Sequence, residues 1–402
     1  MSTGQTPGAI AWNKFRKNPL AMAGLIVIIF AVVIAILGYS ISPDQSPYAN
    51  NQHLELSGKK PGFRVNVLKV RKNEQIEKRG FFYTMFYGRS AEYEEISYLN
   101  YTFSEGQIIL REYTDIPEKE EFYRYLNIPD VIFALAPGSV NNIRISADSL
   151  GFRLISSEEI NAPLALLMHK IEQEHLIRRT YYLGTDRFGR DLLSRLILGA
   201  RISLMVGFIA VAISLIIGIS MGAVAGYYRG KIDQLIMWII NVVWSIPTLL
   251  LVIALTMVIG RGFWQVFVAV GVTMWVEVAR VVRGQVLSLR EKEFIEAAKV
   301  LGYSDFRIIM KHIIPNILSP VIIISAANFA SAILIEAGLS FLGIGVQPPI
   351  SSWGGMVKDH YGFILAGKAY LAFIPGFAIM LMVLAFTMLG NGLRDAFDIR
   401  EE

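Results

Sequence analysis

Apolar residues gather in long stretches that polar segments separate. A transmembrane helix needs about 20 mostly apolar residues, and residues 20–41 form the first such stretch, with no charged residue inside it. A cleaved signal peptide is the alternative, but this apolar run is too long for a typical one. We predict an all-α polytopic membrane protein with six transmembrane helices, at residues 20–41, 202–226, 233–260, 264–283, 317–338 and 370–390.

Basic residues flank these helices unevenly, and the positive-inside rule places segments rich in Lys and Arg in the cytoplasm. Such segments are the N-terminus with Lys14, Arg16 and Lys17, the turn with Arg229 and Lys231, and the stretch 280–311. We therefore expect both termini in the cytoplasm, and residues 42–182 and 340–368 on the opposite side.

The polar segment 42–182 is long enough for a small folded domain. Its β-prone runs at 63–70 and 107–113 are separated by Gly and charged turns. We expect an inserted α+β extracytoplasmic (periplasmic) domain. No catalytic or metal-binding pattern is visible in it, since His169 and His175 lie six residues apart, not at the four-residue spacing of a helical zinc pair.

These elements predict how the chain is divided into segments. It comprises a cytoplasmic N-terminus at 1–19, the first transmembrane helix at 20–41, the extracytoplasmic domain at 42–182, an interfacial helix at 183–201, a transmembrane core at 202–396 with a coupling loop at 284–316, and a cytoplasmic tail at 397–402.

The composition supports the membrane class. Hydrophobic residues make up 53% and charged residues 18%, below the roughly 25% of charged residues in soluble domains. The surplus of 38 Lys and Arg over 33 Asp and Glu is too small and too dispersed to indicate a nucleic-acid partner. Cysteine is absent, which excludes disulfides, thiolate metal sites and cysteine nucleophiles.

A first motif precedes the second helix and contains Gly184, Thr185, Asp186, Gly189, Arg190 and Asp191. Thr185 or Asp186 can cap a short helix, and arginines such as Arg190 and Arg195 can reach lipid headgroups. We expect an external or interfacial helix with a role of its own. The alternative is a helix that only anchors the next crossing.

A second motif lies in the cytoplasmic loop between the fourth and fifth helices. Glu296, Ala297 and Ala298 belong to a run of strong helix formers, which Gly302 ends, and Pro315 opens the next crossing. Two small alanines leave room for another protein to approach closely, and Glu296 offers a charge for a partner arginine. The alternative is an ordinary loop helix.

Polar residues also occur inside the predicted helices. Glu336 and Asn328 are candidates for a translocation path, because an acid at membrane depth is costly and usually faces protein or water. Alternatively, Glu336 is hydrogen-bonded to a neighbouring helix. Glu277 and Arg280 lie three residues apart and can pair on one helix face.

Small residues and proline predict how the helices pack. Gly218, Gly222 and Gly226 recur every four residues, a spacing that lets helix backbones approach closely. Pro247 predicts a kink in the third helix. No G-x-x-x-x-G-K-[ST] loop occurs in the sequence, so a process driven by ATP requires a separate subunit that hydrolyses it.

Together, the segments 183–203, 296–315, 339–356 and 389–395 resemble the permease subunits of ATP-binding-cassette (ABC) importers for dipeptides and oligopeptides, the type with one extra N-terminal helix. The resemblance implies that residues 296–302 form the coupling helix, which docks into an ATPase subunit. The long insertion at 42–182 departs from the family pattern.

The resemblance also implies a function and partners. The chain is expected in the inner membrane as half of the pathway of an ATP-driven, binding-protein-dependent importer. The implied partners are a second homologous permease, two ATPase subunits that hold ATP and Mg²⁺, an extracytoplasmic binding protein and the lipid bilayer. The chain itself is then neither an enzyme nor a cofactor carrier. The family's substrates include dipeptides, longer peptides, nickel chelates and peptide antibiotics.

Two other functions make different demands on the sequence. An ion-coupled secondary transporter needs coupling acids at the midplane and usually internal repeats, and only Glu336 supports it. A membrane-anchored enzyme needs a convergent catalytic constellation in residues 42–182, and the sequence shows none.

Overall fold

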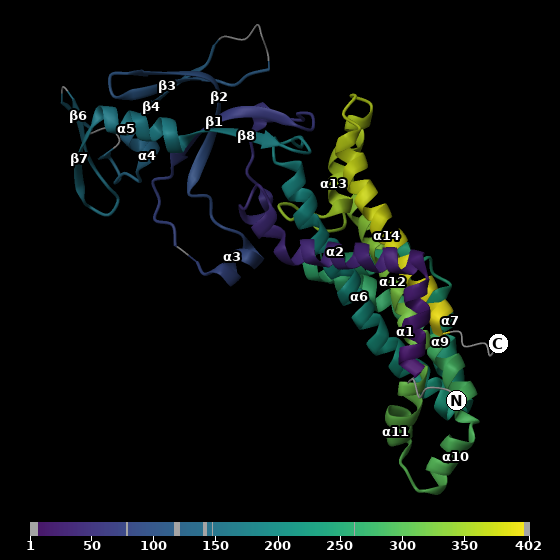
Figure 1. Ribbon diagram of the computed structural model, residues 1–402. Coiled ribbons are helices and arrows are strands. Elements are labelled where there is room, and N and C mark those ends of the chain that lie inside the picture. Colours follow the sequence, from purple (N-terminus) through teal and green to yellow (C-terminus); the bar gives the residue numbers. More distant parts are fainter. Residues whose placement is uncertain are drawn as a thin grey trace. The chain divides into compact units, whose positions relative to one another are not determined.

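The computed structural model describes residues 7–77, 79–115, 121–139, 143–146, 148–260 and 262–397. The chain forms two compact units, one of residues Met1–Leu37 and Leu196–Glu402 and the other of Gly38–Arg195 (Figure 1). We call them the helical unit and the strand-rich unit and treat each by itself. Residues 1–6 of the predicted N-terminus and 398–402 of the predicted tail lie outside the described residues.

Long apolar helices dominate the helical unit. Within the described ranges, five runs are long and apolar enough to cross a membrane: α2 (Pro19–Ile41), α6 (Leu192–Tyr228), α9 (Phe263–Arg290), the run Asp305–Phe341 that ends with α12 (Leu318–Phe341), and α14 (Tyr370–Phe397). The bent pair α7 (Gly230–Trp244) and α8 (Thr248–Ile259) qualifies as one more. Shorter elements are α1 (Pro7–Lys17), α10 (Glu293–Val300), α11 (Asp305–Ile308), η5 (Ile309–Ile313), η6 (Ile314–Ile317), α13 (Trp353–His360) and η7 (Tyr361–Ile364).

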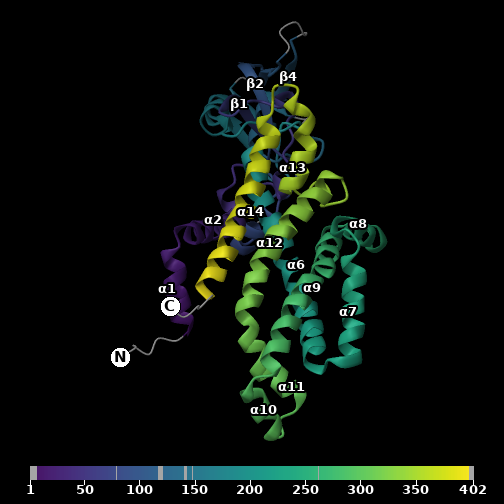
Figure 2. The same ribbon diagram turned by 90° about the vertical axis from the view of Figure 1, so that its right-hand side faces the viewer.

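The third predicted helix, at 233–260, is broken in two. α7 ends at Trp244 and α8 begins at Thr248, with an angle of 92° between them. Pro247 has no N–H to continue the hydrogen-bond ladder of α7, so the break falls where the sequence predicts a kink. Figure 2 shows α8 turned away from the axis of α7.

The interfacial helix predicted at 183–201 is not a separate element, and that prediction was wrong. Residues 184–191 form a loop, and α6 starts at Leu192 and continues without a break to Tyr228. The φ angles of Gly184 and Gly189 are 82° and 73°. This left-handed conformation interrupts a helix, so only the second half of the segment is helical.

Glycines reveal how α6 and α9 run. A Cβ added to Gly218 would lie 2.5 Å from Val278 Cβ, and one added to Gly226 would lie 2.8 Å from Val286 Cβ. The contact advances along both helices in the same direction, so α6 and α9 are parallel. The chain must therefore return between them, and α7 and α8 together make that return despite their bend. Counted this way, the described residues contain up to six candidate spans.

Several helix ends gather at one end of the helical unit. Tyr227 near the end of α6 shares a core with Ile295 of α10. Phe15 of α1 packs with Ala396 at the end of α14, and one cavity is lined by both Pro320 at the start of α12 and Arg394 of α14. Consequently α1, α10 and the end of α14 lie on the same side of the spanning helices (Figure 2).

An antiparallel sheet in the order β4-β3-β2-β1-β8 forms the base of the strand-rich unit, beside a smaller sheet in the order β5-β6-β7. The strands are β1 (Phe63–Arg71), β2 (Tyr93–Ser104), β3 (Gln107–Glu112), β4 (Tyr123–Asn127), β5 (Arg144–Ser146), β6 (Ser149–Arg153), β7 (Glu159–Pro163) and β8 (Leu176–Tyr181). The helical elements are α3 (Phe81–Tyr87), α4 (Ile128–Ile132), α5 (Leu164–Lys170), η1 (Pro47–Ala49), η2 (Leu54–Leu56) and η4 (Ile171–His175).

Alternating burial explains the sheet. In β3, Ile108 and Leu110 are fully buried while Arg111 is exposed, which is the period of a strand with one face on a core. Both pack with Leu68 of β1 and Ile128 of α4. The two predicted strands, at 63–70 and 107–113, are confirmed. The unit extends to residue 195, beyond the predicted 182, because the loop 184–191 also packs inside it.

Candidate functional site

The helix α10 in the predicted coupling loop has a buried and an exposed face. Ile295 and Ala298 are buried in a core shared with α9 and η5, whereas Glu296 and Ala297 are exposed. The two alanines therefore differ: Ala298 packs against its own chain, and of this pair only Ala297 is free to meet a partner. The sequence argument for two partner-facing alanines holds for Ala297 alone.

Gly302 ends α10 in the predicted way. Its φ is 76°, the Tyr303 amide donates to Ala298 O at 3.1 Å, and the Gly302 amide donates to Lys299 O at 2.9 Å. These are the two bonds of a Schellman motif, which satisfies the last carbonyls of a helix. The turn that follows is therefore fixed in shape.

The next short helix, α11, is tied to the spanning helices. The Tyr227 hydroxyl of α6 donates to Asp305 Oδ1 at 2.7 Å, and the Tyr303 and His312 rings stack with centroids 5.9 Å apart. Pro315 lies in η6, directly before α12. No loop separates the consecutive elements α11, η5, η6 and α12. A displacement of α11 would therefore also displace the start of α12.

A cluster of apolar side chains lies exposed on α10, α11 and the turn between them. Val300 is 87% exposed and Phe306 is 74% exposed, and Phe294 and Leu301 are also exposed. Charged residues surround them, including Glu296. An exposed apolar patch with a polar rim is typical of an interaction site. We call Phe294, Glu296, Val300, Leu301 and Phe306 the coupling surface, and Figure 1 shows that α10 and α11 form a protruding tip. The sequence alone does not show that these apolar residues face outward, because other apolar positions of α10, such as Ile295, belong to the core.

Two arginines of α9 bind α7. Arg283 donates to both carboxylate oxygens of Asp233, at 2.5 and 2.7 Å. Arg280 donates to Asn241 Oδ1 at 2.8 Å. The predicted pair of Glu277 with Arg280 is not among the ion pairs of the described residues, because Arg280 turns to α7 instead of along its own helix.

Glu336 and Asn328, the predicted path residues, are both fully buried in α12. Ser340 Oγ donates to Glu336 Oε1 at 2.7 Å and lies 3.4 Å from Ser352 Oγ, at the cap of α13. No hydrogen bond to Glu336 Oε2 or to the Asn328 amide occurs within the described part of the chain. Neither residue lines the cavities described below, so this conformation gives them an interior position.

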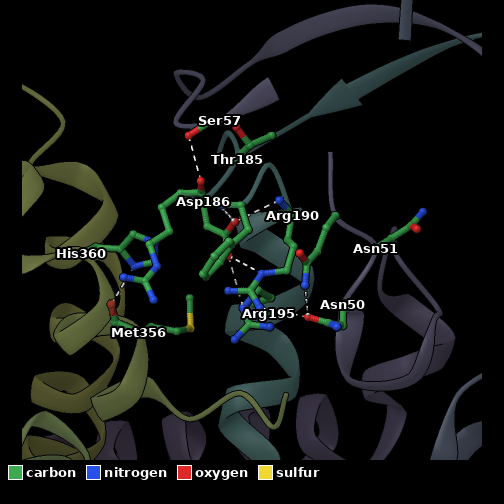
Figure 3. A network of polar contacts seen from close by, with 12 residues as sticks. Asn50, Asn51, Ser57, Thr185, Asp186, Arg190, Arg195, Met356 and His360 are labelled. Carbon is green, nitrogen blue, oxygen red and sulfur yellow. Dashed lines mark hydrogen bonds and ion pairs between the residues drawn. The ribbon is translucent and has the colours of Figure 1, made fainter. Parts of the chain in front are cut away.

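The polar residues of the first motif are buried, and Figure 3 shows Asp186, Arg190 and Asn50 turned toward one another. Asp186 Oδ1 accepts from the amides of Phe188 and Arg190, at 2.8 and 3.0 Å, and Asp186 Oδ2 accepts from Arg190 Nε at 2.6 Å. Arg195 Nε lies 3.6 Å from the same oxygen. Arg190 also donates to Asn50 Oδ1 at 3.0 Å. Arg190 and Arg195 are almost fully buried, so they do not face lipid headgroups as predicted.

The rest of this motif closes the same loop. Thr185 Oγ1 accepts from the Lys59 amide at 2.8 Å, and the Ser194 amide donates to Asp191 Oδ2 at 2.8 Å. Burial raises the pKa of Asp191, against the hydrogen bonds from Ser194 that lower it. A Cβ on Gly184 would lie 2.2 Å from Lys59 O, so only glycine fits there. The side chains of this loop are thus satisfied by hydrogen bonds within the protein, which favours a structural role for the motif.

Comparisons with known proteins agree with this architecture. The family model described as "Binding-protein-dependent transport system inner membrane component" matches residues 214–401, and that of the "N-terminal TM domain of oligopeptide transport permease C" matches residues 6–55. Residues 56–213, which include most of the strand-rich unit, lie between the two matches.

Curated relatives match over most of their own length. The dipeptide transport system permease proteins DppC of Alkalihalophilus pseudofirmus and Bacillus subtilis are 45% identical over 218 residues, which is 54% of this chain and 71% and 68% of theirs. The oligopeptide transport system permease protein OppC of Haemophilus influenzae is 43% identical over 221 residues, 55% of this chain and 71% of its own.

Among solved structures, the inward-facing MetNI methionine ABC transporter matches 49% of this chain and 98% of its own chain, with 20% identity and a TM-score of 0.38. The curated relatives are transporter subunits and not enzymes. With its multiple spanning helices, the chain belongs to the family of inner membrane components of binding-protein-dependent transport systems, the permease subunits of ABC importers.

Proposed function

We propose that this chain forms half of the translocation pathway of an importer for dipeptides or oligopeptides. The similarity to dipeptide transport permeases, at 45% identity over 218 residues, is the observation that carries the proposal. The sequence contains no P-loop, so ATP and Mg²⁺ are bound by separate ATPase subunits. The chain has no cofactor of its own in this scheme.

The proposed complex contains two permeases, two ATPases and a binding protein. One set of spanning helices provides only half of a pathway in this scheme, and a second homologous permease completes it. The binding protein delivers the peptide from outside the cell. ATP then closes the ATPase subunits on each other, and the permeases switch between outward-open and inward-open states.

The coupling surface is the proposed contact with an ATPase subunit. Its apolar residues Phe294, Val300, Leu301 and Phe306 fit a groove on the ATPase, and Glu296 pairs with a cation at the edge of that groove. Because α10 follows α9 and α11 leads directly into α12, movement of the ATPase rotates both spanning helices. Ala297, Ala298, Gly302 and Pro315 shape this connection.

The distribution of charge and the order of the elements support a cytoplasmic and an external side for the spanning helices. Lys14, Arg16 and Lys17 lie in the last part of α1, on the same side of the helices as the coupling surface, so this side is proposed as cytoplasmic. The strand-rich unit follows the opposite end of α2 and precedes the start of α6, so it is proposed to lie outside the inner membrane. There, the loop from Gly184 to Asp191 holds the start of α6 in place.

Reconstitution tests the proposal. The complex, co-purified through a tag on this chain and placed in proteoliposomes with its binding protein, should take up a labelled dipeptide or oligopeptide only with ATP. If ATP hydrolysis is stimulated by the binding protein but no peptide accumulates, the substrate class is wrong.

Charge reversal tests the coupling surface. Glu296→Arg should lower ATP-dependent uptake at least tenfold and weaken the association of the ATPase, because the repelled cation lies at the contact. Glu158→Arg reverses an exposed carboxylate of the strand-rich unit and should change neither quantity. Equal uptake by the Glu296→Arg complex and the unaltered complex would exclude this surface as the coupling site.

A further inference from the structure

A cavity of about 320 Å³ lies where the break between α7 and α8 faces α9 and α12. Its wall includes Trp244 and Thr248 beside the break, Thr273 and Glu277 of α9, and Ser331 of α12. Among the described residues that line it, Glu277 is the only one with a charge. The cavity is thus a mostly apolar recess with three hydroxyl groups and a single carboxylate.

Glu277 lies in the cytoplasmic half of the predicted crossing 264–283, one turn before the basic stretch 280–311. α9 runs from Phe263 to Arg290, which is longer than the roughly 20 residues that cross a bilayer, so its last turns extend beyond the membrane. An acid within a membrane helix is costly, and such residues face the protein interior or a water-filled cavity. Glu277 is exposed between the buried Val276 and Val278, so it faces the cavity and not the core.

The two nearby arginines of α9 make no ion pair with this carboxylate. Arg283 is bound by Asp233, and Arg280, one turn further along α9, is bound by the neutral groups of Asn241 and Trp244. Within the described ranges of the chain, Glu277 has no ion pair or hydrogen bond. Its carboxylate oxygens are therefore open to hydrogen bonds from a passing ammonium group.

A second cavity continues along the same helix. It measures about 510 Å³ and shares Ser331 and Leu334 of α12 with the first. Its wall is mostly apolar up to Asn391 and Arg394 near the end of α14. The two cavities together run along α12, and Glu277 is the single acid among their described lining residues.

We propose that Glu277 binds the terminal ammonium group of a peptide as the peptide passes this recess. The proposal rests on the proposed function. A peptide carries an α-ammonium group at neutral pH, and a carboxylate in a low-dielectric recess attracts it far more strongly than in water. The hydroxyl groups of Thr248 and Ser331 on the same wall can accept its remaining N–H bonds.

The test compares uptake of a labelled dialanine by complexes with unaltered, Glu277→Gln and Glu277→Asp permease in proteoliposomes. At pH 7, Glu277→Gln should take up peptide at about one tenth of the unaltered rate, and Glu277→Asp at a third or more. Assembly with the second permease and basal ATP hydrolysis should stay the same.

A second measurement asks whether the ammonium is the group recognised. The α-amino pKa of a peptide is about 8, so at pH 9 most of the dialanine is neutral. The binding protein acts equally on all variants, so the ratio of Glu277→Gln to unaltered uptake isolates this residue. The ratio should rise from about one tenth at pH 7 to at least one half at pH 9.

Three outcomes would overturn the inference. A ratio above one half at pH 7 would show that Glu277 does not bind substrate. A low ratio that stays the same at pH 9 would exclude the ammonium as its ligand. Loss of the second permease from the Glu277→Gln complex would identify Glu277 as an intersubunit contact. Absence of any peptide uptake by the unaltered complex would instead refute the proposed function.

Discussion

Arg280 stacks its guanidinium group on the indole ring of Trp244, with the guanidinium carbon 3.6 Å from the ring centroid. The contact joins the middle of α9 to the last residue of α7, directly before the 92° break. It also holds Arg280 away from Glu277, which lies one turn earlier on the same helix. One aromatic ring therefore braces the break between α7 and α8 and keeps Arg280 from pairing directly with Glu277.

Trp244→Ala should lower peptide uptake about three- to tenfold. A cation–π contact at an exposed ring is worth about 0.5–1 kcal/mol, and without the ring Arg280 can pair with Glu277 at the i, i+3 spacing. ATP-dependent uptake in proteoliposomes measures the effect. Trp238→Ala removes another exposed indole from α7 and should have no effect.

The double variant Trp244→Ala/Arg280→Gln separates this explanation from simple damage to the joint. If the freed arginine is what inhibits, removing its charge should restore uptake to within twofold of the Arg280→Gln single variant. Continued loss in the double variant would mean that the ring acts by packing alone.

The glycine ladder of α6 gives a prediction about stability. A Cβ at Gly222 would lie 2.5 Å from the carbonyl oxygen of Ala279 and 2.9 Å from Val282 Cβ. Since a backbone oxygen cannot move aside, Gly222→Ala should destabilise the folded permease by about 1–3 kcal/mol.

The temperature at which half of the purified complex loses its monodisperse elution peak would report this change. Gly284→Ala in α9 is the matched control, since a Cβ there meets nothing within 4 Å. It should leave the midpoint equal or slightly higher because alanine favours helix. Equal midpoints for both variants would contradict the close packing of α6 and α9.

Local patterns in the sequence predicted much of the helical unit. The four-residue spacing of Gly218 and Gly222 marks the contact with α9, Pro247 marks the break, and Gly302 marks the end of α10. Each is a property of one residue and its near neighbours, which is why sequence alone reveals it.

Contacts between distant residues could not be predicted in this way. Arg280 has an acid within one turn, but its partners lie on another helix, more than 30 residues earlier. In the sequence, Asp186 and Arg190 are typical of an interfacial helix. The structure shows a loop instead, because the glycines beside them are left-handed and their partners, such as Asn50, are distant in sequence. The burial of Ala298 likewise depends on the residues of α9 and η5 that pack against α10.

The buried carboxylate of Asp186 gives a third prediction. It accepts hydrogen bonds from two amides and from Arg190, and Arg195 is beside it. Asp186→Asn would leave buried arginine charge without its counterion, and breaking such a pair costs about 3–5 kcal/mol. The variant should make the strand-rich unit sensitive to limited proteolysis.

Asp148→Asn is the same chemical change at an exposed carboxylate of that unit and should leave the cleavage rate unchanged. If Asp186→Asn is cleaved no faster than this control, the buried network contributes little to the stability of the unit.

The last prediction concerns Glu336, which the sequence offered as a path residue. The structure instead surrounds it with α12 and the start of α13, where Ser340 donates to it at 2.7 Å. Glu336→Gln keeps an oxygen that can accept this bond and removes a charge whose burial is costly. Uptake should therefore stay within twofold of the unaltered complex, and thermal stability should be equal or higher.

Glu336→Leu should lower thermal stability, because it leaves the Ser340 hydroxyl, which lies beside Ser352, without its acceptor. A folded Glu336→Gln complex that hydrolyses ATP but takes up tenfold less peptide would return Glu336 to the translocation path. That outcome, set beside the result for Glu277→Gln, decides which of the two acids the substrate meets.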